Sequence, residues 1–281
     1  MRGITLTAAA AILTSLTAPA LAADKGEVEL AYVEWATEVA STNVVKVVLE
    51  DLGYEVDITP VSAAAMWEAV ATGDVDGIIS AWLPVTQHHY QEKAGDDVID
   101  LGPNIEGARI GLVVPSYVEI DSIAELNSIA ERLDNEIIGI DPGAGVMSKT
   151  EQALEAYGLD DIDLIEGSDP IMTAVLGDAV EDGDWIAVTG WTPHWMFARY
   201  DLKFLEDPQG VYGGAEEIRT VVRKDLEADM PEVYAVLDNF YWTPEQMAEL
   251  MAWNQEKRAD PYKNARRWVE AHPEVVEAWL P

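Results

Sequence analysis

Short hydrophobic runs alternate with stretches of helical spacing along this chain, and the order occurs twice. The first half is read, in order, as strand 28–33, a helix ending at Gly53, strand 55–59, a helix around 66–70 and a strand from 79 that ends at Trp82. The second half is read as strand 136–140, a helix ending at Gly158, strand 162–165, a helix around 171–175 and a strand from 188 that ends at Trp191. Alternating strands and helices favour parallel sheets built from βαβ units. The repeat therefore predicts two similar α/β lobes.

The last strand of each repeat ends in a shared motif, in which Trp is followed by one residue and then Pro. The two copies are 79–84 and 188–193, with Trp82 and Trp191 at the points where the strands end. A third tryptophan, Trp35, follows the first strand directly. Ligands of open parallel sheets bind outside the carboxyl ends of the strands. We therefore expect a ligand site near these three rings.

The fold class expected is a two-lobed α/β protein, with mainly parallel sheets flanked by helices and a ligand cleft between the lobes. The apolar run 110–117 is expected to cross from one lobe to the other, and 210–223 to return. Lobe I would comprise residues 24–113 plus 214–281, and lobe II residues 114–213. Two crossings of this kind would act as a hinge.

Two further helical features are expected. Residues 41–43, which are Ser, Thr and Asn, offer N-caps for a helix over 44–52. The segment after Asp225 is helical by pattern, with a capping box from Thr243 to Gln246. Three tryptophans are expected to pack this tail onto the first lobe: Trp253, Trp268 and Trp279.

The N-terminal residues read as a secretory signal peptide, residues 1–22. Arg2 supplies the charged start, 4–13 is an apolar run too short to span a bilayer, and 20–22 is a small-x-small cleavage pattern. The chain has no cysteine, which excludes disulfides, thiolate metal sites and a lipid-modified cysteine anchor. We expect a free protein outside the cytoplasm, most simply in a bacterial periplasm.

The net charge of −35 argues against nucleic acid or anionic lipid as a partner, because each phosphate contact would begin from repulsion. The acidic residues are scattered along the sequence, as on a strongly solvated surface. No calcium-loop motif is present, and four histidines without paired spacing do not suggest a zinc site. The sequence predicts no metal and no cofactor.

A glycine-rich turn follows the first strand of the second repeat. Gly143 and Gly145 permit close backbone approach, and a helix is expected directly afterwards, over 149–157. The amides of Gly145 and Val146 could then point outward from a helix N-terminus, where the helix dipole favours an anion. The absence of a Gly-Lys-Ser/Thr ending excludes a nucleotide-binding P-loop.

The tryptophans and the turn together predict one kind of ligand. Ring faces of Trp35, Trp82 and Trp191 would attract a cation that cannot donate hydrogen bonds, such as a quaternary ammonium. The amides of Gly145 and Val146 would bind a carboxylate. A small zwitterion carrying both groups would bridge the lobes and favour a closed state.

At these residues the chain resembles the glycine betaine-binding proteins of ABC importers, the OpuAC-like family of periplasmic binding proteins. The matching stretches are 31–35, 80–84, 112–117, 139–148 and 189–197. The resemblance implies that Trp35, Trp82 and Trp191 form a box around the trimethylammonium group. It also implies that the amides of Gly145 and Val146 hold the carboxylate, and that a membrane permease subunit is the protein partner.

One position departs from the family pattern. Family members often place a carboxylate-binding His five residues after the loop tryptophan, where this chain has Gln87, followed by His88. Gln87 could donate the same bond through its amide without titrating near neutral pH. Alternatively, a shift of one residue would bring in His88.

The ligand identity stays open at this stage. Glycine betaine is expected, with dimethylsulfoniopropionate, choline or carnitine as alternatives of the same type. A secreted small-molecule hydrolase is the alternative from another class, although no nucleophile motif or Ser-His-Asp arrangement supports an enzyme. His194 is expected to be a structural histidine, and the protein is expected to be a monomer.

Overall fold

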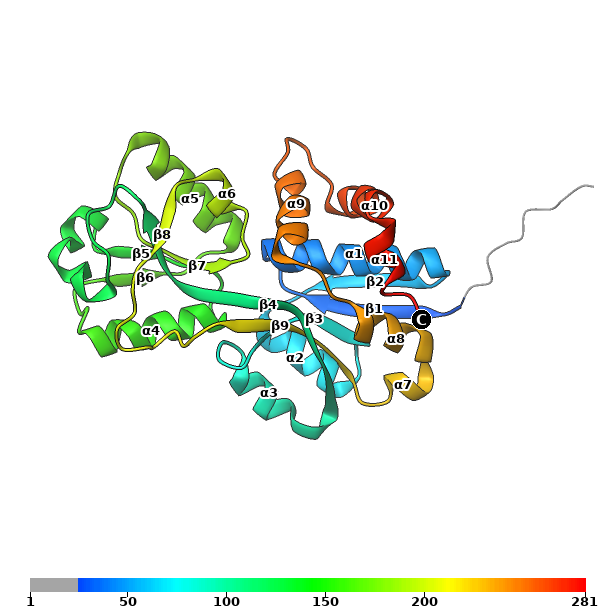
Figure 1. Ribbon diagram of the computed structural model, residues 1–281. Coiled ribbons are helices and arrows are strands. Elements are labelled where there is room, and N and C mark those ends of the chain that lie inside the picture. The colour runs from blue at the N-terminus through cyan, green and yellow to red at the C-terminus, as the bar shows by residue number, and fades with distance from the viewer. Residues whose placement is uncertain (1–24) are drawn as a thin grey trace, which may run out of the picture.

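The computed structural model describes residues 25–281, so the predicted signal peptide lies outside the described residues. Two α/β lobes lie side by side and are joined by two long strands (Figure 1). We call the part built on the first three strands and the C-terminal helices lobe I, and the part built on the fifth to eighth strands lobe II. The predicted two-lobed α/β class is confirmed.

Lobe I contains a parallel sheet in the order β2-β1-β3. Its strands are β1 (Glu27–Tyr32), β2 (Glu55–Pro60) and β3 (Gly77–Leu83). Its first helices are α1 (Ala36–Leu52), α2 (Ala63–Thr72) and α3 (His88–Ala94). Strand β3 is buried along its whole length, as expected for a parallel strand covered on both faces.

Lobe II repeats the arrangement with the order β7-β5-β6, again parallel. Its strands are β5 (Glu136–Ile138), β6 (Asp163–Ile165), β7 (Val188–Thr192) and β8 (Leu202–Phe204). Its helices are the short 3₁₀ turns η2 (Ile123–Ser128) and η3 (Ala130–Leu133), then α4 (Gly145–Tyr157), α5 (Asp169–Asp182) and α6 (Met196–Arg199). Both Trp-x-Pro motifs carry a cis proline, at Pro84 and Pro193.

The lobes are connected by β4 (Val98–Pro115) and β9 (Glu216–Arg223), which run antiparallel beside each other (Figure 1). Ala108 is the last residue of β4 that pairs with β9, and the next residue, Arg109, already pairs with β7 in lobe II. The strand therefore changes lobes at a single peptide, just before the segment predicted to cross. The chain returns to lobe I at Glu216, within the predicted return segment.

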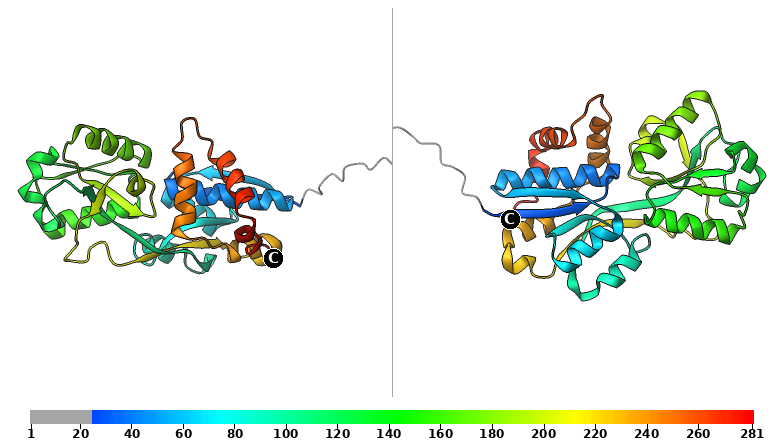
Figure 2. Two further views of the ribbon diagram at one scale, coloured as in Figure 1. Left: turned by 45° about the horizontal axis from the view of Figure 1, so that its top comes forward. Right: turned by 180° about the vertical axis from the view of Figure 1, so that it is seen from behind.

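Helix α1 starts earlier than the sequence suggested. The predicted N-caps at 41–43 were wrong, because these residues lie buried inside α1, which begins at Ala36. Trp35 is the N-cap residue, and its side chain makes no capping bond. Helix α1 runs from the seam between the lobes toward the outer end of lobe I (Figure 2). Helix α4 likewise begins at Gly145 and not at Lys149.

The C-terminal segment is helical, as predicted, and covers α1. Its helices are α7 (Leu226–Asp229), α8 (Pro231–Asn239), α9 (Pro244–Asn254), α10 (Pro261–Ala271) and α11 (Pro273–Glu277). The capping box at Thr243 is present. Tyr262 of α10 donates a hydrogen bond to Glu50 of α1. Trp268 and Trp279 are buried and stacked with ring centroids 6.1 Å apart, whereas Trp253 is half-buried beneath Arg267.

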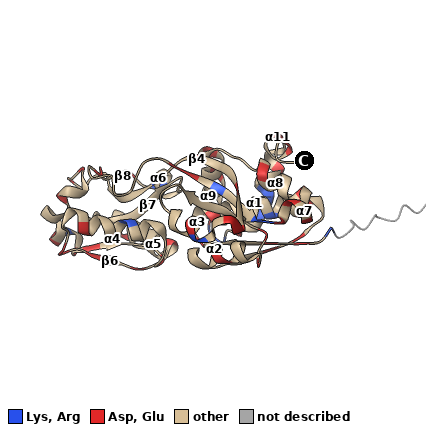
Figure 3. Ribbon diagram, turned by 90° about the horizontal axis from the view of Figure 1, so that it is seen from below, with Lys and Arg blue, Asp and Glu red and all other residues tan. Residues whose placement is uncertain are grey.

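Acidic residues are spread over both lobes and do not gather on one element (Figure 3). Among residues 25–281, no helix combines the length and the hydrophobicity needed to cross a bilayer.

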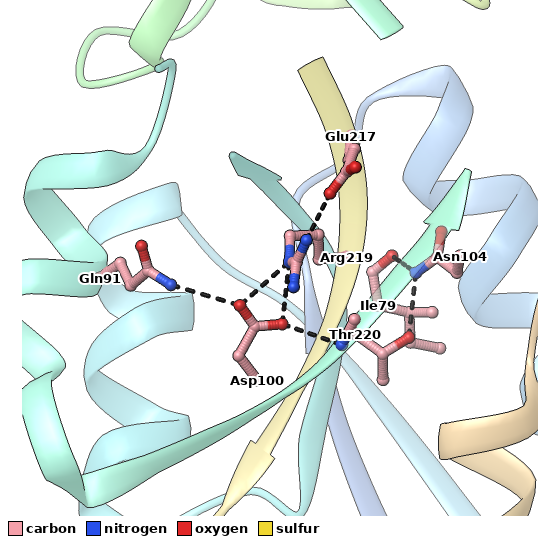
Figure 4. A network of polar contacts seen from close by, with 8 residues as sticks. Ile79, Gln91, Asp100, Asn104, Glu217, Arg219 and Thr220 are labelled. Atoms are coloured by element: carbon pink, nitrogen blue, oxygen red, sulfur yellow. Dashed lines mark hydrogen bonds and ion pairs between the residues drawn. The ribbon is translucent and has the colours of Figure 1, made fainter. Parts of the chain in front are cut away.

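Asn104 of β4 links strands β3, β4 and β9 at the lobe I end of the connecting strands (Figure 4). Its Nδ2 donates to the Ile79 carbonyl oxygen of β3 and to Thr220 Oγ1 of β9, each at 3.0 Å. Both β3 and β4 lose register here, so the ladder alone does not hold this region. Beside it, Arg219 Nε contacts both carboxylate oxygens of Asp100, at 2.9 and 3.0 Å.

We expect Asn104→Ala to lower the free energy of unfolding by about 1–3 kcal/mol, because it removes two buried hydrogen bonds and leaves their acceptors without that donor. Urea unfolding measures the change. Asn127→Ala, which removes an exposed amide bonded to the Gly158 carbonyl, is the matched control and should stay within about 0.5 kcal/mol. Equal losses for the two variants would contradict the assignment.

Candidate functional site

Trp35 and Trp191 meet across the seam between the lobes. Their ring centroids are 6.4 Å apart with an interplanar angle of 53°, and the residues are 5 % and 3 % exposed. Trp35 comes from the start of α1 in lobe I, whereas Trp191 lies near the end of β7 in lobe II. The pair therefore exists only when the two lobes are close together.

Carboxylates orient two of the three predicted tryptophans. Trp35 Nε1 donates across the seam to Asp141 Oδ2 at 2.9 Å. Trp82 Nε1 donates within lobe I to Glu38 Oε1 at 3.2 Å. Trp191 Nε1 is buried and has no partner within the described part of the chain. The structure thus brings Trp35 and Trp191 together directly. It connects Trp82 only to Trp35, through Glu38, whose amide donates to the Trp35 carbonyl.

Glu38 is a buried carboxyl that the sequence did not single out. Its Oε2 accepts a hydrogen bond from the Val33 amide at 3.3 Å, and the residue is 1 % exposed. Burial raises the pKa of Glu38 well above its usual range, and the hydrogen bonds from Trp82 and Val33 only partly oppose this. Glu38 therefore retains its proton to a higher pH than an exposed glutamate does.

Gly145 and Val146, the residues of the predicted anion site, lie at the N-terminus of α4. They are its first two residues, and both are buried. The amides of Met147 and Ser148 both donate to the Ala144 carbonyl, so Gly145 and Val146 precede the helix's own hydrogen bonds. Their N–H groups are therefore the ones that a helix N-terminus offers to an anion.

A loop of lobe I packs directly on this helix end. A Cβ added at Gly145 would lie 2.2 Å from the Thr86 carbonyl oxygen, so only glycine permits the contact. Glu216 holds the loop in place, because its Oε1 accepts from the amides of Val85 and Thr86, each at 2.7 Å. The Thr86 hydroxyl donates to the other carboxylate oxygen. The first residue of β9 thus fixes the loop that contacts lobe II.

Gln87 follows in this loop and is completely buried. Its Oε1 accepts from Trp67 Nε1 at 2.9 Å and from the Trp82 amide at 3.2 Å. These bonds orient the amide group and leave Nε2 as a buried donor without a partner among residues 25–281. The next residue differs, because the His88 side chain is 55 % exposed and pairs with Glu92 at 3.4 Å.

His194 is a satisfied histidine, as predicted. Its ring is buried, its Nδ1 accepts from the Met196 amide at 3.2 Å, and its Nε2 lies 3.1 Å from Asp169 Oδ1. The bond to Nδ1 places the proton on Nε2. Asp169 opens α5 and was not identified from the sequence.

A cleft of 490 Å³ opens beside the tryptophans, where α1, α5 and α9 approach one another. Ala36, Asp169 and Trp195 belong to its lining, whereas the three predicted tryptophans do not. The cleft is thus lined by residues of both lobes, and the three rings are not part of its wall. The partners Glu38, Asp169 and Glu216 carried no sequence signal beyond being acidic residues in an acidic chain, whereas Asp141 lies in the matching stretch 139–148.

Comparison with known families assigns the chain. Residues 26–271 match the model of the substrate-binding domain of the ABC-type glycine betaine transport system, OpuAC. The chain belongs to this family. The glycine betaine/carnitine transport binding protein GbuC of Listeria monocytogenes is 47 % identical over 153 residues. That match spans 54 % of this chain and about half, 51 %, of the curated relative.

Solved structures of the family superpose on nearly the whole chain. The glycine betaine/L-proline-binding protein ProX of Borrelia burgdorferi is 43 % identical with a TM-score of 0.88, covering 91 % of this chain and 97 % of the other. Lactococcal OpuAC, closed on glycine betaine, is 42 % identical with a TM-score of 0.87, covering 91 % and 100 %. A choline-binding protein with bound choline is 27 % identical with a TM-score of 0.84, covering 90 % and 91 %.

The buried Glu38 predicts a specific pH dependence of stability. A folded-state pKa above the unfolded value means that the group's contribution is complete at low pH and is lost as pH rises. Above the ordinary value of 4.5, wild type should therefore lose stability relative to Glu38→Gln, by up to about 1.4 kcal/mol per pH unit.

Urea unfolding between pH 4.5 and 8 would measure this difference. Glu155→Gln, at an exposed position of α4, is the matched control and should run parallel to wild type. A Glu38→Gln curve that also runs parallel would contradict the prediction.

Proposed function

We propose that this chain is the extracytoplasmic substrate-binding protein of an ABC importer, and that it binds glycine betaine between its lobes. One observation carries the proposal: Thr86 of lobe I packs on Gly145 of lobe II, and on each side of this contact lie donors without a partner among residues 25–281. They are the amides at the start of α4 and the buried Nε2 of Gln87. Buried donors without partners are rare in folded proteins, so a cluster of them suits a ligand that supplies acceptors.

The onium end of the ligand would lie against indole faces. Trp35 and Trp191 approach each other from opposite lobes, and Trp82 is connected to Trp35 through Glu38. Each ring contributes roughly 0.5–2 kcal/mol to a desolvated cation. A methylated ammonium has no N–H to satisfy, so it needs no carboxylate partner in this apolar place.

The carboxylate end would accept hydrogen bonds from Gly145, Val146 and Gln87. Charge-assisted bonds of this kind contribute roughly 1.5–3 kcal/mol each. Together with the ring contacts they are sufficient for micromolar binding, which corresponds to about 8 kcal/mol. Since the donors come from both lobes, the ligand would stabilise the closed arrangement.

Gln87, and not His88, is the residue that we assign to the carboxylate. Its oxygen is already engaged by Trp67 and Trp82, so its Nε2 is fixed as a donor. His88 points to the surface, where it pairs with Glu92. A glutamine at this position would make carboxylate binding insensitive to histidine protonation.

The proposed setting is the periplasm. The signal peptide predicted at residues 1–22 would direct export and would then be cleaved off. The protein partner would be the permease subunit of the importer, which receives ligand from the closed form. We infer a monomer, because the proposed site draws on both lobes of one chain.

Related ligands remain alternatives of the same type. GbuC is named for glycine betaine and carnitine, and a solved relative holds choline. Dimethylsulfoniopropionate also carries an onium group and a carboxylate. The hydrolase alternative is not favoured, because the buried carboxyls of Glu38 and Asp169 are both engaged as hydrogen-bond acceptors.

Calorimetric titration of the mature protein with glycine betaine tests the proposal, and we expect micromolar affinity or tighter. Choline, carnitine and dimethylsulfoniopropionate complete the panel, and mass spectrometry should recover the ligand unchanged.

Trp191→Ala should weaken binding at least tenfold without altering the fold, whereas Trp253→Ala, in the C-terminal segment, serves as the control. Absence of binding to every compound would refute the proposal.

Gln87→Leu should weaken glycine betaine binding about ten- to a hundredfold, because it removes one charge-assisted hydrogen bond. The same change should affect choline much less, since choline has no carboxylate. His88→Ala is the matched control and should change affinity less than twofold. The opposite ranking of these two variants would assign the carboxylate contact to His88.

A further inference from the structure

The start of α1 lacks a capping side chain of its own and receives one from the other lobe. The N-cap residue Trp35 makes no side-chain capping bond. Instead, the Ala36 amide donates to Asp169 Oδ2 at 2.8 Å, across the seam. A carboxylate at a helix N-terminus satisfies an otherwise unpaired amide and complements the helix dipole. The cap can exist only when the lobes are together.

Asp169 is itself held from within lobe II. It is 3 % exposed, and its Oδ1 lies 3.1 Å from the protonated Nε2 of His194. The His194 ring packs edge-on against Trp191, with ring centroids 4.7 Å apart and an interplanar angle of 83°. The carboxylate therefore connects the Trp191 wall of the proposed site to the α1 amide that follows Trp35.

Trp35 is thus fastened to lobe II at two neighbouring points. Its indole donates to Asp141, and the next amide, that of Ala36, donates to Asp169. Trp35 belongs to lobe I and Trp191 to lobe II. The distance between the two rings therefore depends on both bonds. Neither carboxylate needs to touch a ligand in order to control how tightly the walls enclose it.

We propose that Asp169 is a positioning residue that caps α1 across the seam in the closed state and so determines how slowly the ligand leaves. The inference rests on the proposed betaine-binding function. A bond made only after closure stabilises the closed complex and leaves the encounter step unaffected. Its loss should therefore accelerate dissociation and leave association unchanged.

Asp169→Asn is the most informative substitution, since it retains the shape of the side chain and replaces one of its two acceptor oxygens with an NH₂ group. In this variant the side-chain oxygen would accept from the Ala36 amide, and the side-chain NH₂ would then face the His194 Nε2–H, so that two donors oppose each other. If the histidine proton moved to Nδ1, that N–H would instead oppose the Met196 amide. No arrangement of the four groups satisfies every donor.

Stopped-flow tryptophan fluorescence with glycine betaine is the test. We expect the dissociation rate of Asp169→Asn to rise at least tenfold and its association rate to stay within twofold of wild type. Asp178→Asn, an exposed position on the same helix that lines the same cleft, should match wild type in both rates. An unchanged dissociation rate, or an equal loss in association rate, would overturn the inference.

Ala36→Pro provides a second, independent variant. Proline is tolerated at the first helical position, and the ψ of 149° at Trp35 is compatible with a following proline. The change removes the donor while leaving Asp169 intact. In an Asp169→Ala background it should have little further effect on the dissociation rate, because the bond is already absent. Additive effects would contradict a shared bond.

A ligand-free measurement separates this inference from the proposed function. The chain has no cysteine, so spin labels at Glu181→Cys and Gln255→Cys, two residues that line the cleft from α5 and from the end of α9, report the distance between lobes. Asp169→Asn should shift the ligand-free distances upward, and Asp178→Asn should not. If wild type fails to bind glycine betaine, the proposed function is wrong. Identical ligand-free distance distributions for wild type and Asp169→Asn would overturn the positioning role of Asp169, whether or not the protein binds glycine betaine.

Discussion

The architecture depends on how closely two backbones approach at the seam. The Thr86 carbonyl lies so near the first residue of α4 that no side chain fits between them, and Gly145 meets this requirement. On its two sides lie the first amides of α4 in one lobe and Gln87 in the other, and all these residues are buried. The proposed carboxylate pocket is in this sense a product of lobe contact, and neither lobe contains it alone.

Four carboxyl groups organise the surroundings of this contact, three of them buried and that of Asp141 partly buried. Glu216 holds the loop, Glu38 holds the Trp82 indole, Asp141 holds the Trp35 indole, and Asp169 caps α1. Each accepts from N–H groups and has no lysine or arginine bonded to it in the described structure. In a chain with a net charge of −35, these few acids bind N–H groups at or near the contact between the lobes.

The sequence was informative where structure follows from local pattern. The doubled Trp-x-Pro motif and the order of apolar runs predicted two parallel sheets, because burial on both faces leaves continuous hydrophobic strands. The start of α1 was missed for a physical reason: its capping carboxylate is Asp169, 133 residues away, so no local signal exists. Composition also could not decide between Gln87 and His88, because the choice depends on which side chain the loop buries.

The strand β4 has one further mechanical consequence. It exchanges partners between two consecutive residues, Ala108 and Arg109, and the residue opposite Ala108 is Glu216. The carboxylate that accepts from the amides of residues 85 and 86 is therefore anchored where β4 passes from lobe I to lobe II. If the lobes rotate about this crossing, the loop would move together with it. Movement of the lobes would then be coupled to the position of the Gln87 donor.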